Sequence, residues 1–190
     1  MCNCFYVILQ KLKNQIMKHQ EFFAQQWHRE MKRTLVAIKA LPTDMNKLEF
    51  KPDPKSRTSH EIIGHILPHA ESLLHCIDTG DINEVQHVFK STEEAANYFE
   101  TNSNLLVEKL KTVSDEDWDS KVVTLSLNGR KIYEGKMMDM FWTLLLDSIH
   151  HRGQLTTYYR PMGMRNPSIY GPTAEDMEDR LKALAAEQQN

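Results

Sequence analysis

The stretch of the sequence best equipped for chemistry is 144–160, which reads LLLDSIHHRGQLTTYYR. It contains Asp147 and His151, whose i, i+4 spacing places both side chains on the same face of an α-helix. A carboxylate and an imidazole so placed can bind one cation, as paired histidines do in zinc proteases. His150 points about a third of a turn away and cannot face the same point. The alternative is a helix that carries a surface aspartate and two ordinary histidines.

Apolar residues lead into this pair in a nearly continuous run. They are Met137, Met138, Phe141, Trp142, Leu144, Leu145, Leu146 and Ile149. Such a run predicts a helix that is buried on most of its sides. A carboxylate or an imidazole inside it is costly unless it is hydrogen-bonded, protonated or bound to metal.

A second group of histidines lies in the stretch that follows two prolines and a capping-box pattern. His65 and His69 share a helix face at i, i+4, and His60 and His75 lie on either side of them. Pro68 removes a helical hydrogen bond and therefore predicts a kink beside these residues. Each of these histidines also has an ordinary interpretation as a core-edge residue that hydrogen-bonds the backbone.

Composition limits the classes of protein to be considered. The chain has 190 residues, which suits one domain, and a net charge of -3 without a basic patch, which argues against a nucleic-acid partner. Its 3 cysteines do not form a disulfide framework and favour a reducing, cytoplasmic location. The apolar run in residues 5–9 is too short to cross a membrane and lacks the flanks of a signal peptide.

Apolar periodicity and capping patterns predict four main helices. They are Lys11–Leu41, Thr58 to about Asp78, Thr92–Thr112, and a fourth that follows Gly135. Asn128-Gly129 lies between two β-rich runs and predicts a hairpin before the fourth helix. Residues 81–90 are predicted to be a polar connector. The sequence therefore indicates an all-α four-helix bundle with one small hairpin.

The two ends of the chain are predicted to lie outside this bundle. Residues 1–16 are expected to be a poorly ordered or extra lead-in, and Met17 is an alternative start. Thr173 and Asp176 begin a last, charged helix with a weak apolar stripe, which reaches about Glu187. We expect this helix, within 173–190, to pack peripherally or against a second subunit.

Two blocks of the sequence resemble the DinB-like (DinB/YfiT-like) family. HHRGQLTTYYRPMGMRNPSIYGP, residues 150–172, is similar to that family's HHRGQL…YxRxxG…P signature, and PDPKSRTSHEIIGHILPHAESL, residues 52–73, is similar to its second-helix segment. The resemblance implies an up-down-down-up bundle across 17–172, which commonly forms homodimers. It also implies a divalent metal held by His65, Asp147 and His151, with His69 in reserve if the kink turns His65 away.

Asp147 stands where many members of the family have histidine. The resulting set of two imidazoles and one carboxylate is harder than three imidazoles and shifts preference among nickel, zinc, manganese and iron. Three protein ligands leave coordination positions open, so that the metal can activate bound water or thiol. The resemblance therefore implies a thiol-dependent S-transferase or a hydrolase acting on a small molecule with a low-molecular-weight thiol.

Three other residues receive roles beside the metal. Glu61, one turn before His65, is a candidate catalytic base, with helix capping as its alternative role. Gln154 is a candidate for orienting a cofactor or a ligand, and Arg152 is predicted to form a structural ion pair. Two alternatives to an enzyme stay open. One is a metal-binding or sensor bundle without turnover, and the other is a structural dimerisation bundle with an incidental histidine cluster.

Overall fold

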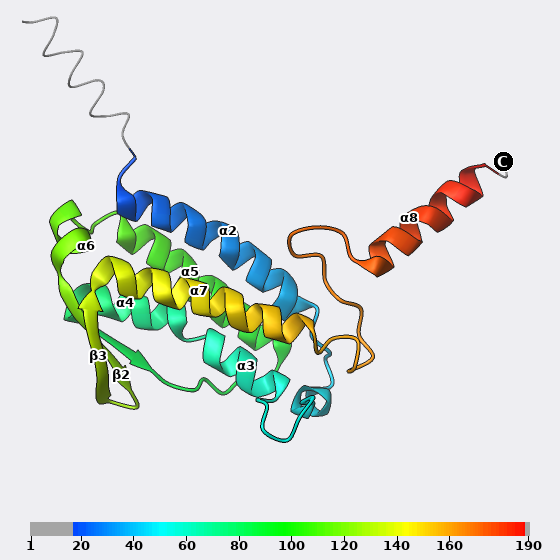
Figure 1. The fold of residues 1–190 in the computed structure, drawn as a ribbon, viewed down its shortest axis with the longest axis horizontal. Helices are drawn as coiled ribbons and strands as arrows, with labels where there is room; N and C mark the ends of the chain where they lie inside the picture. The colour runs from blue at the N-terminus through cyan, green and yellow to red at the C-terminus, as the bar shows by residue number, and fades with distance from the viewer. Residues whose placement is uncertain (1–16, 189–190) are drawn as a thin grey trace, which may run out of the picture.

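Four long helical segments pack side by side in the computed structural model, which describes residues 17–188 (Figure 1). They are α2 (His19–Lys39), the successive helices α3 (Ser59–Ile66) and α4 (His69–Thr79), α5 (Thr92–Leu110) and α7 (Met137–Thr156). The α2 helix packs against α5 and α7, while α3 packs against α7 and α4 against both α5 and α7. Because α2 and α7 run opposite to the other segments, the predicted up-down-down-up bundle is confirmed (Figure 1).

The core forms where the apolar faces of these helices meet. Phe23 of α2 lies at its aromatic centre, with its ring centroid 5.2 Å from Trp118, 5.7 Å from Phe141 and 5.2 Å from Trp142. Trp118 comes from the short helix α6 (Asp115–Ser120), which closes the end of the bundle beside the start of α7. Tilted and edge-on aromatic pairs of this kind add to the free energy gained from burial alone.

The second bundle helix is divided at Pro68 into α3 and α4. The α3 helix begins with the predicted capping box: the Glu61 N–H donates to Thr58 Oγ1 at 3.1 Å, and Glu61 accepts from the Thr58 N–H at 2.7 Å. Proline has no N–H, so the carbonyl of Gly64, four residues earlier, lacks its helical donor. The His87 N–H donates to that carbonyl at 2.8 Å instead. The kink predicted from the sequence is therefore present.

Residues 85–89 form a strap that crosses α3 at this break. The Gln86 side chain donates to the Glu61 carbonyl at 2.9 Å, and His60 Nε2 lies 3.2 Å from the Phe89 carbonyl. The approach is so close that a Cβ on Gly64 would lie 2.2 Å from Gln86 Nε2 and 2.4 Å from the His87 oxygen. Glycine is thus required at position 64 by the strap.

A three-stranded sheet covers one side of the bundle. The hairpin of β2 (Val122–Leu127) and β3 (Arg130–Lys136) confirms the prediction, with positive φ angles of 50° at Asn128 and 76° at Gly129. The prediction of a polar connector over residues 81–90 is wrong in its first part, because β1 (Asp81–Glu84) is a strand. It pairs in parallel with β2, a partner far along the chain that no local pattern announces.

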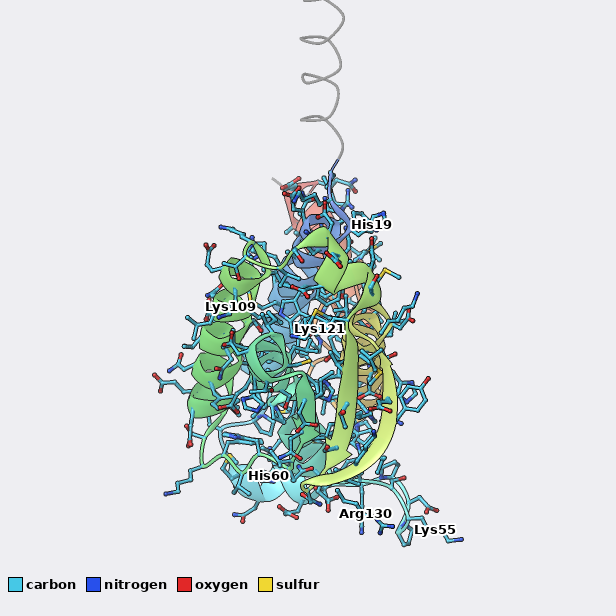
Figure 2. All side chains as sticks on the ribbon, turned by 90° about the vertical axis from the view of Figure 1, so that its left-hand side faces the viewer. His19, Lys55, His60, Lys109, Lys121 and Arg130 are labelled. Carbon is cyan, nitrogen blue, oxygen red and sulfur yellow. The ribbon has the colours of Figure 1, made fainter. Side chains whose placement is uncertain are left out.

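The last helix, α8 (Ala174–Glu187), projects away from the bundle and has no buried residue (Figure 1). Its peripheral position agrees with the prediction. The opposite ends of the bundle are visible in Figure 2, where His19 lies at one end and Lys55, His60 and Arg130 lie at the other. No helix among residues 17–188 is long and apolar enough to cross a membrane. The predicted lead-in, 1–16, lies outside the described residues.

Gly64→Ala is expected to lower the free energy of unfolding by roughly 1–3 kcal/mol, the usual cost of overpacking. The added methyl group would overlap the strap at both Gln86 and His87. Urea unfolding of both variants measures the effect, with Gly153→Ala as control because a Cβ there meets no atom within 4 Å. The control is expected to be stabilised by up to about 1 kcal/mol. Equal effects of the two substitutions would contradict the role of the strap.

Candidate metal centre

Three metal-capable side chains meet between the broken second helix and α7. They are His65 from α3, His69 from α4 and Asp147 from α7, and one ligand atom of each lies within 4.8 Å of the others. Asp147 Oδ2 lies 3.0 Å from His65 Nε2 and 3.7 Å from His69 Nε2. This cluster can hold a metal ion, because its donors converge from separate helices onto one small volume.

His69 is fixed in the orientation that a metal ligand needs. Ser148 donates its hydroxyl proton to the Leu144 carbonyl at 2.9 Å, so its oxygen accepts from the Nδ1–H of His69 at 2.8 Å. The hydrogen-bond network thereby assigns the tautomer and leaves a lone pair on Nε2. Among the described residues no group hydrogen-bonds that buried nitrogen. Burial lowers the pKa of His69 to about 3, so the ring is neutral near pH 7.

His151 approaches the same aspartate from one turn further along α7. Its Nε2 lies 3.4 Å from Asp147 Oδ1, and its Nδ1–H donates to Gln154 Oε1 at 2.7 Å. The structure therefore brings His65, Asp147 and His151 together and adds His69. Two overlapping triads result, which share the pair His65 and Asp147. Gln154 holds the ring of His151, while a role of Gln154 in cofactor binding stays a prediction.

Asp147 lies between three histidines and is only half-buried. Burial acts to raise the pKa of Asp147, but the net shift is downward, chiefly because of the hydrogen bond from His65. The carboxylate is thus ionised near neutral pH and supplies the negative ligand of the cluster.

Glu84, at the end of β1, is a further acidic group of the site that the sequence analysis missed. Its Oε1 lies 4.0 Å from His69 Nε2, and burial raises the pKa of Glu84. Nothing local marks this residue, because the parallel pairing of β1 with β2 carries it toward the cluster. Glu61 lies on the exposed side of α3, where its carboxylate caps the helix at the Thr58 N–H.

Arg152 anchors the part of α7 that carries these ligands. Its guanidinium is buried, at 2% exposure, and lies 2.7 Å from Glu30 of α2, which confirms the predicted structural ion pair. It also donates to the Tyr170 hydroxyl at 2.6 Å. Pairing of this kind fixes α7 relative to α2 and to the loop after α7. The contacts of Arg152 therefore also help to position His151.

An up-down-down-up bundle with a His–His–Asp cluster between its second and fourth helical segments defines the class of this protein as a DinB-like bundle with a candidate metal site. The chain belongs to the DinB family, whose sequence model matches residues 12–189.

Relatives and solved structures agree with this assignment. The chain is 26% identical over 122 residues to the uncharacterized protein YjoA of Bacillus subtilis, a match that spans 64% of this chain and 77% of YjoA. It is 33% identical over 88 residues to the uncharacterized protein YrdA of the same organism, over 45% of this chain and 48% of YrdA.

Two crystal structures share the fold. A DinB-like protein from Bacillus cereus superposes with a TM-score of 0.60 at 22% identity, over 78% of this chain and 95% of that one. YjoA superposes with a TM-score of 0.54 at 20% identity, over 78% of this chain and 96% of that one.

Acidification of the metal-free protein below about pH 6.5 is expected to lower its free energy of unfolding, because about 6.5 is the pKa of histidine in an unfolded chain. Below that pH the unfolded chain gains a proton on His69. In the folded protein His69 stays neutral, because its pKa is lowered to about 3. One such proton contributes up to about 1.4 kcal/mol per pH unit. Urea titrations from neutral to acidic pH, with chelator present, measure the slope.

His69→Asn is the matched variant for this measurement, because its amide N–H can still donate to Ser148. Above the pH range in which carboxylates titrate, the free energy of unfolding of His69→Asn is expected to change less steeply with pH than that of the unmodified protein. Identical slopes would show that His69 is protonated in the folded state.

Proposed function

We propose that the protein is a metal-dependent enzyme that acts on a small molecule, using a divalent cation to activate a thiol or water. The observation that carries this proposal is the buried Nε2 of His69, which has a lone pair, no hydrogen-bond donor among the described residues and a position beside His65 and Asp147. Unsatisfied buried polar atoms are rare and call for an explanation, which a bound cation would provide.

The donor set fits a divalent transition metal. Neutral imidazoles suit nickel, zinc and iron, and the ionised carboxylate of Asp147 extends the range to manganese. His65 and Asp147 would hold the ion together with His69, His151 or both. When bound with a position open, such an ion makes water or thiol acidic enough to act as a nucleophile near neutral pH. Nickel or zinc is our first expectation.

Two residues around the cluster would support the reaction: one would orient a metal ligand, and the other would accept a proton. Gln154 holds the Nδ1–H of His151, which keeps Nε2 directed at Asp147. Glu84 has a pKa raised by burial and lies beside His69, so it is better placed than the capping Glu61 to take a proton from an incoming nucleophile. The thiol-dependent S-transferase activity, the low-molecular-weight thiol and a homodimer are supported by family resemblance.

The alternative function is a metal sensor without turnover. It is favoured by the position of His151, whose Nε2 lies 3.4 Å from Asp147 Oδ1, beside the group of His65, His69 and Asp147. A cation held by all four residues would have a closed coordination shell. Closed tetrahedral sites are structural, whereas catalytic sites keep a position for substrate. Coordination spectroscopy of the cobalt-substituted protein with and without added thiol separates these two functions.

His65→Ala and Asp147→Ala are each expected to abolish stoichiometric binding of nickel and zinc, because both overlapping triads use these residues. His150→Ala is the matched control, since this exposed histidine is outside the group of His65, His69 and Asp147. Elemental analysis after loading and gel filtration measures the metal, and circular dichroism checks that the fold survives. Full metal content in either cluster variant would refute the assignment.

Metal-loaded protein is expected to conjugate a small thiol to an electrophilic acceptor faster than the metal-free protein does. Mass spectrometry of the conjugate, with several low-molecular-weight thiols at neutral pH, follows the reaction. Asp147→Ala should fall to the metal-free rate, while His150→Ala should keep the full rate. Equal rates for loaded and metal-free protein would remove thiol transfer from the proposal and leave the hydrolase or the sensor.

A further inference from the structure

A guanidinium group stands at the edge of the metal cluster without a carboxylate partner. Arg57, in the loop before α3, is exposed, and its Nη1 lies 3.4 Å from His151 Nε2. Within residues 17–188 the side chain of Arg57 makes this one polar contact. The Tyr158 hydroxyl donates to the Arg57 carbonyl at 3.3 Å, which ties the loop to the chain just after α7. The position of Arg57 is therefore held by the fold, while its guanidinium stays available.

The contact with His151 uses little of what Arg57 can offer. Since the Nδ1–H of His151 donates to Gln154, its Nε2 carries a lone pair that accepts one N–H of Arg57. A guanidinium has five N–H donors in a planar fork. The Gln154 side chain likewise uses its oxygen on His151 and has no recorded partner for its NH₂ group. Unused donors thus lie on both sides of His151.

The cluster itself contains acidic groups. Asp147 lies among the histidines, with Oδ1 3.4 Å from His151 Nε2, and Glu84 lies 4.0 Å from His69 and is partly withdrawn from water. Burial raises the pKa of Glu84, while the charges of His65 and Arg57 act in the opposite direction. Lys55, two residues before Arg57, lies at the same end of the molecule as the start of α3 (Figure 2). Arg57 therefore places a cationic donor at the edge of the cluster, beside His151.

We propose that Arg57 forms an anion-binding subsite beside the metal cluster, which receives an oxyanion group, carboxylate or phosphate, of the substrate or of the thiol. This inference rests on the proposed function and adds the chemical class of the molecule to it. A planar guanidinium matches both oxyanions through two parallel N–H···O bonds. The anion would displace the weak contact with His151, whose long distance makes it easy to replace.

Calorimetric titration of nickel-loaded protein with inorganic phosphate and, separately, with acetate tests this subsite. Arg57→Ala is expected to weaken binding of the preferred anion about tenfold, equivalent to about 1.4 kcal/mol. Arg57→Lys is expected to be intermediate, because an ammonium keeps the charge and loses the fork. The control is Arg29→Ala, which removes an exposed arginine from α2 and should leave anion affinity unchanged. The two anions distinguish phosphate from carboxylate as the group bound.

Metal content measured on the same samples separates the two hypotheses. If the unmodified protein and Arg57→Ala carry equal nickel and bind phosphate and acetate equally, the subsite is refuted and the proposed function stands. If the unmodified protein binds neither anion, the subsite is also refuted. If it takes up no metal, the proposed function fails and this inference fails with it. Arg57→Lys keeps the charge of the loop, so it carries the test if Arg57→Ala does not fold.

Discussion

The missing N–H of Pro68 is the constraint on which the site depends. It leaves the Gly64 carbonyl without a helical donor, and the His87 N–H takes that place. The strap that supplies this donor continues directly from β1, so the same hydrogen bond fixes where Glu84 lies relative to His69. The break also places His65 and His69 in separate helices, with their rings 5.0 Å apart and edge to face. The missing N–H of Pro68 therefore influences how α3, α4 and the strap lie around the cluster.

The cluster is maintained against a cost in stability. A buried polar nitrogen without a partner destabilises a fold by about 1–3 kcal/mol, and His69 Nε2 is such an atom. Rotation of the ring to satisfy it is prevented, because Ser148 is already committed to Nδ1 and to the Leu144 carbonyl. An apolar residue at position 69 would avoid this cost. Sites that tolerate such a penalty are commonly functional, and here a cation is the partner that the geometry lacks.

Local patterns in the sequence were sufficient to predict the fold and the pair of Asp147 and His151 in the cluster. The capping box of Thr58 and Glu61, the Asn128-Gly129 turn and the i, i+4 pair of Asp147 and His151 each encode their geometry within a few residues. The position of Glu84 depends on a parallel pairing between distant segments, which short patterns do not encode. The sequence analysis assigned His151 and held His69 in reserve for His65. That His65 and His69 both lie beside Asp147 follows from how α3, α4 and α7 pack.

The two overlapping triads give the surroundings of His151 a decisive part in the chemistry. If the cation sits with His65, His69 and Asp147, then His151 keeps its Nε2 lone pair and remains in contact with Arg57 at the mouth of the site. If His151 binds the cation, that lone pair is used and Arg57 loses its recorded partner. In both arrangements the guanidinium of Arg57 stands beside His151 at the edge of the cluster. A site built only to sequester metal has no need of such a group, which is why we propose a ligand-binding role for Arg57.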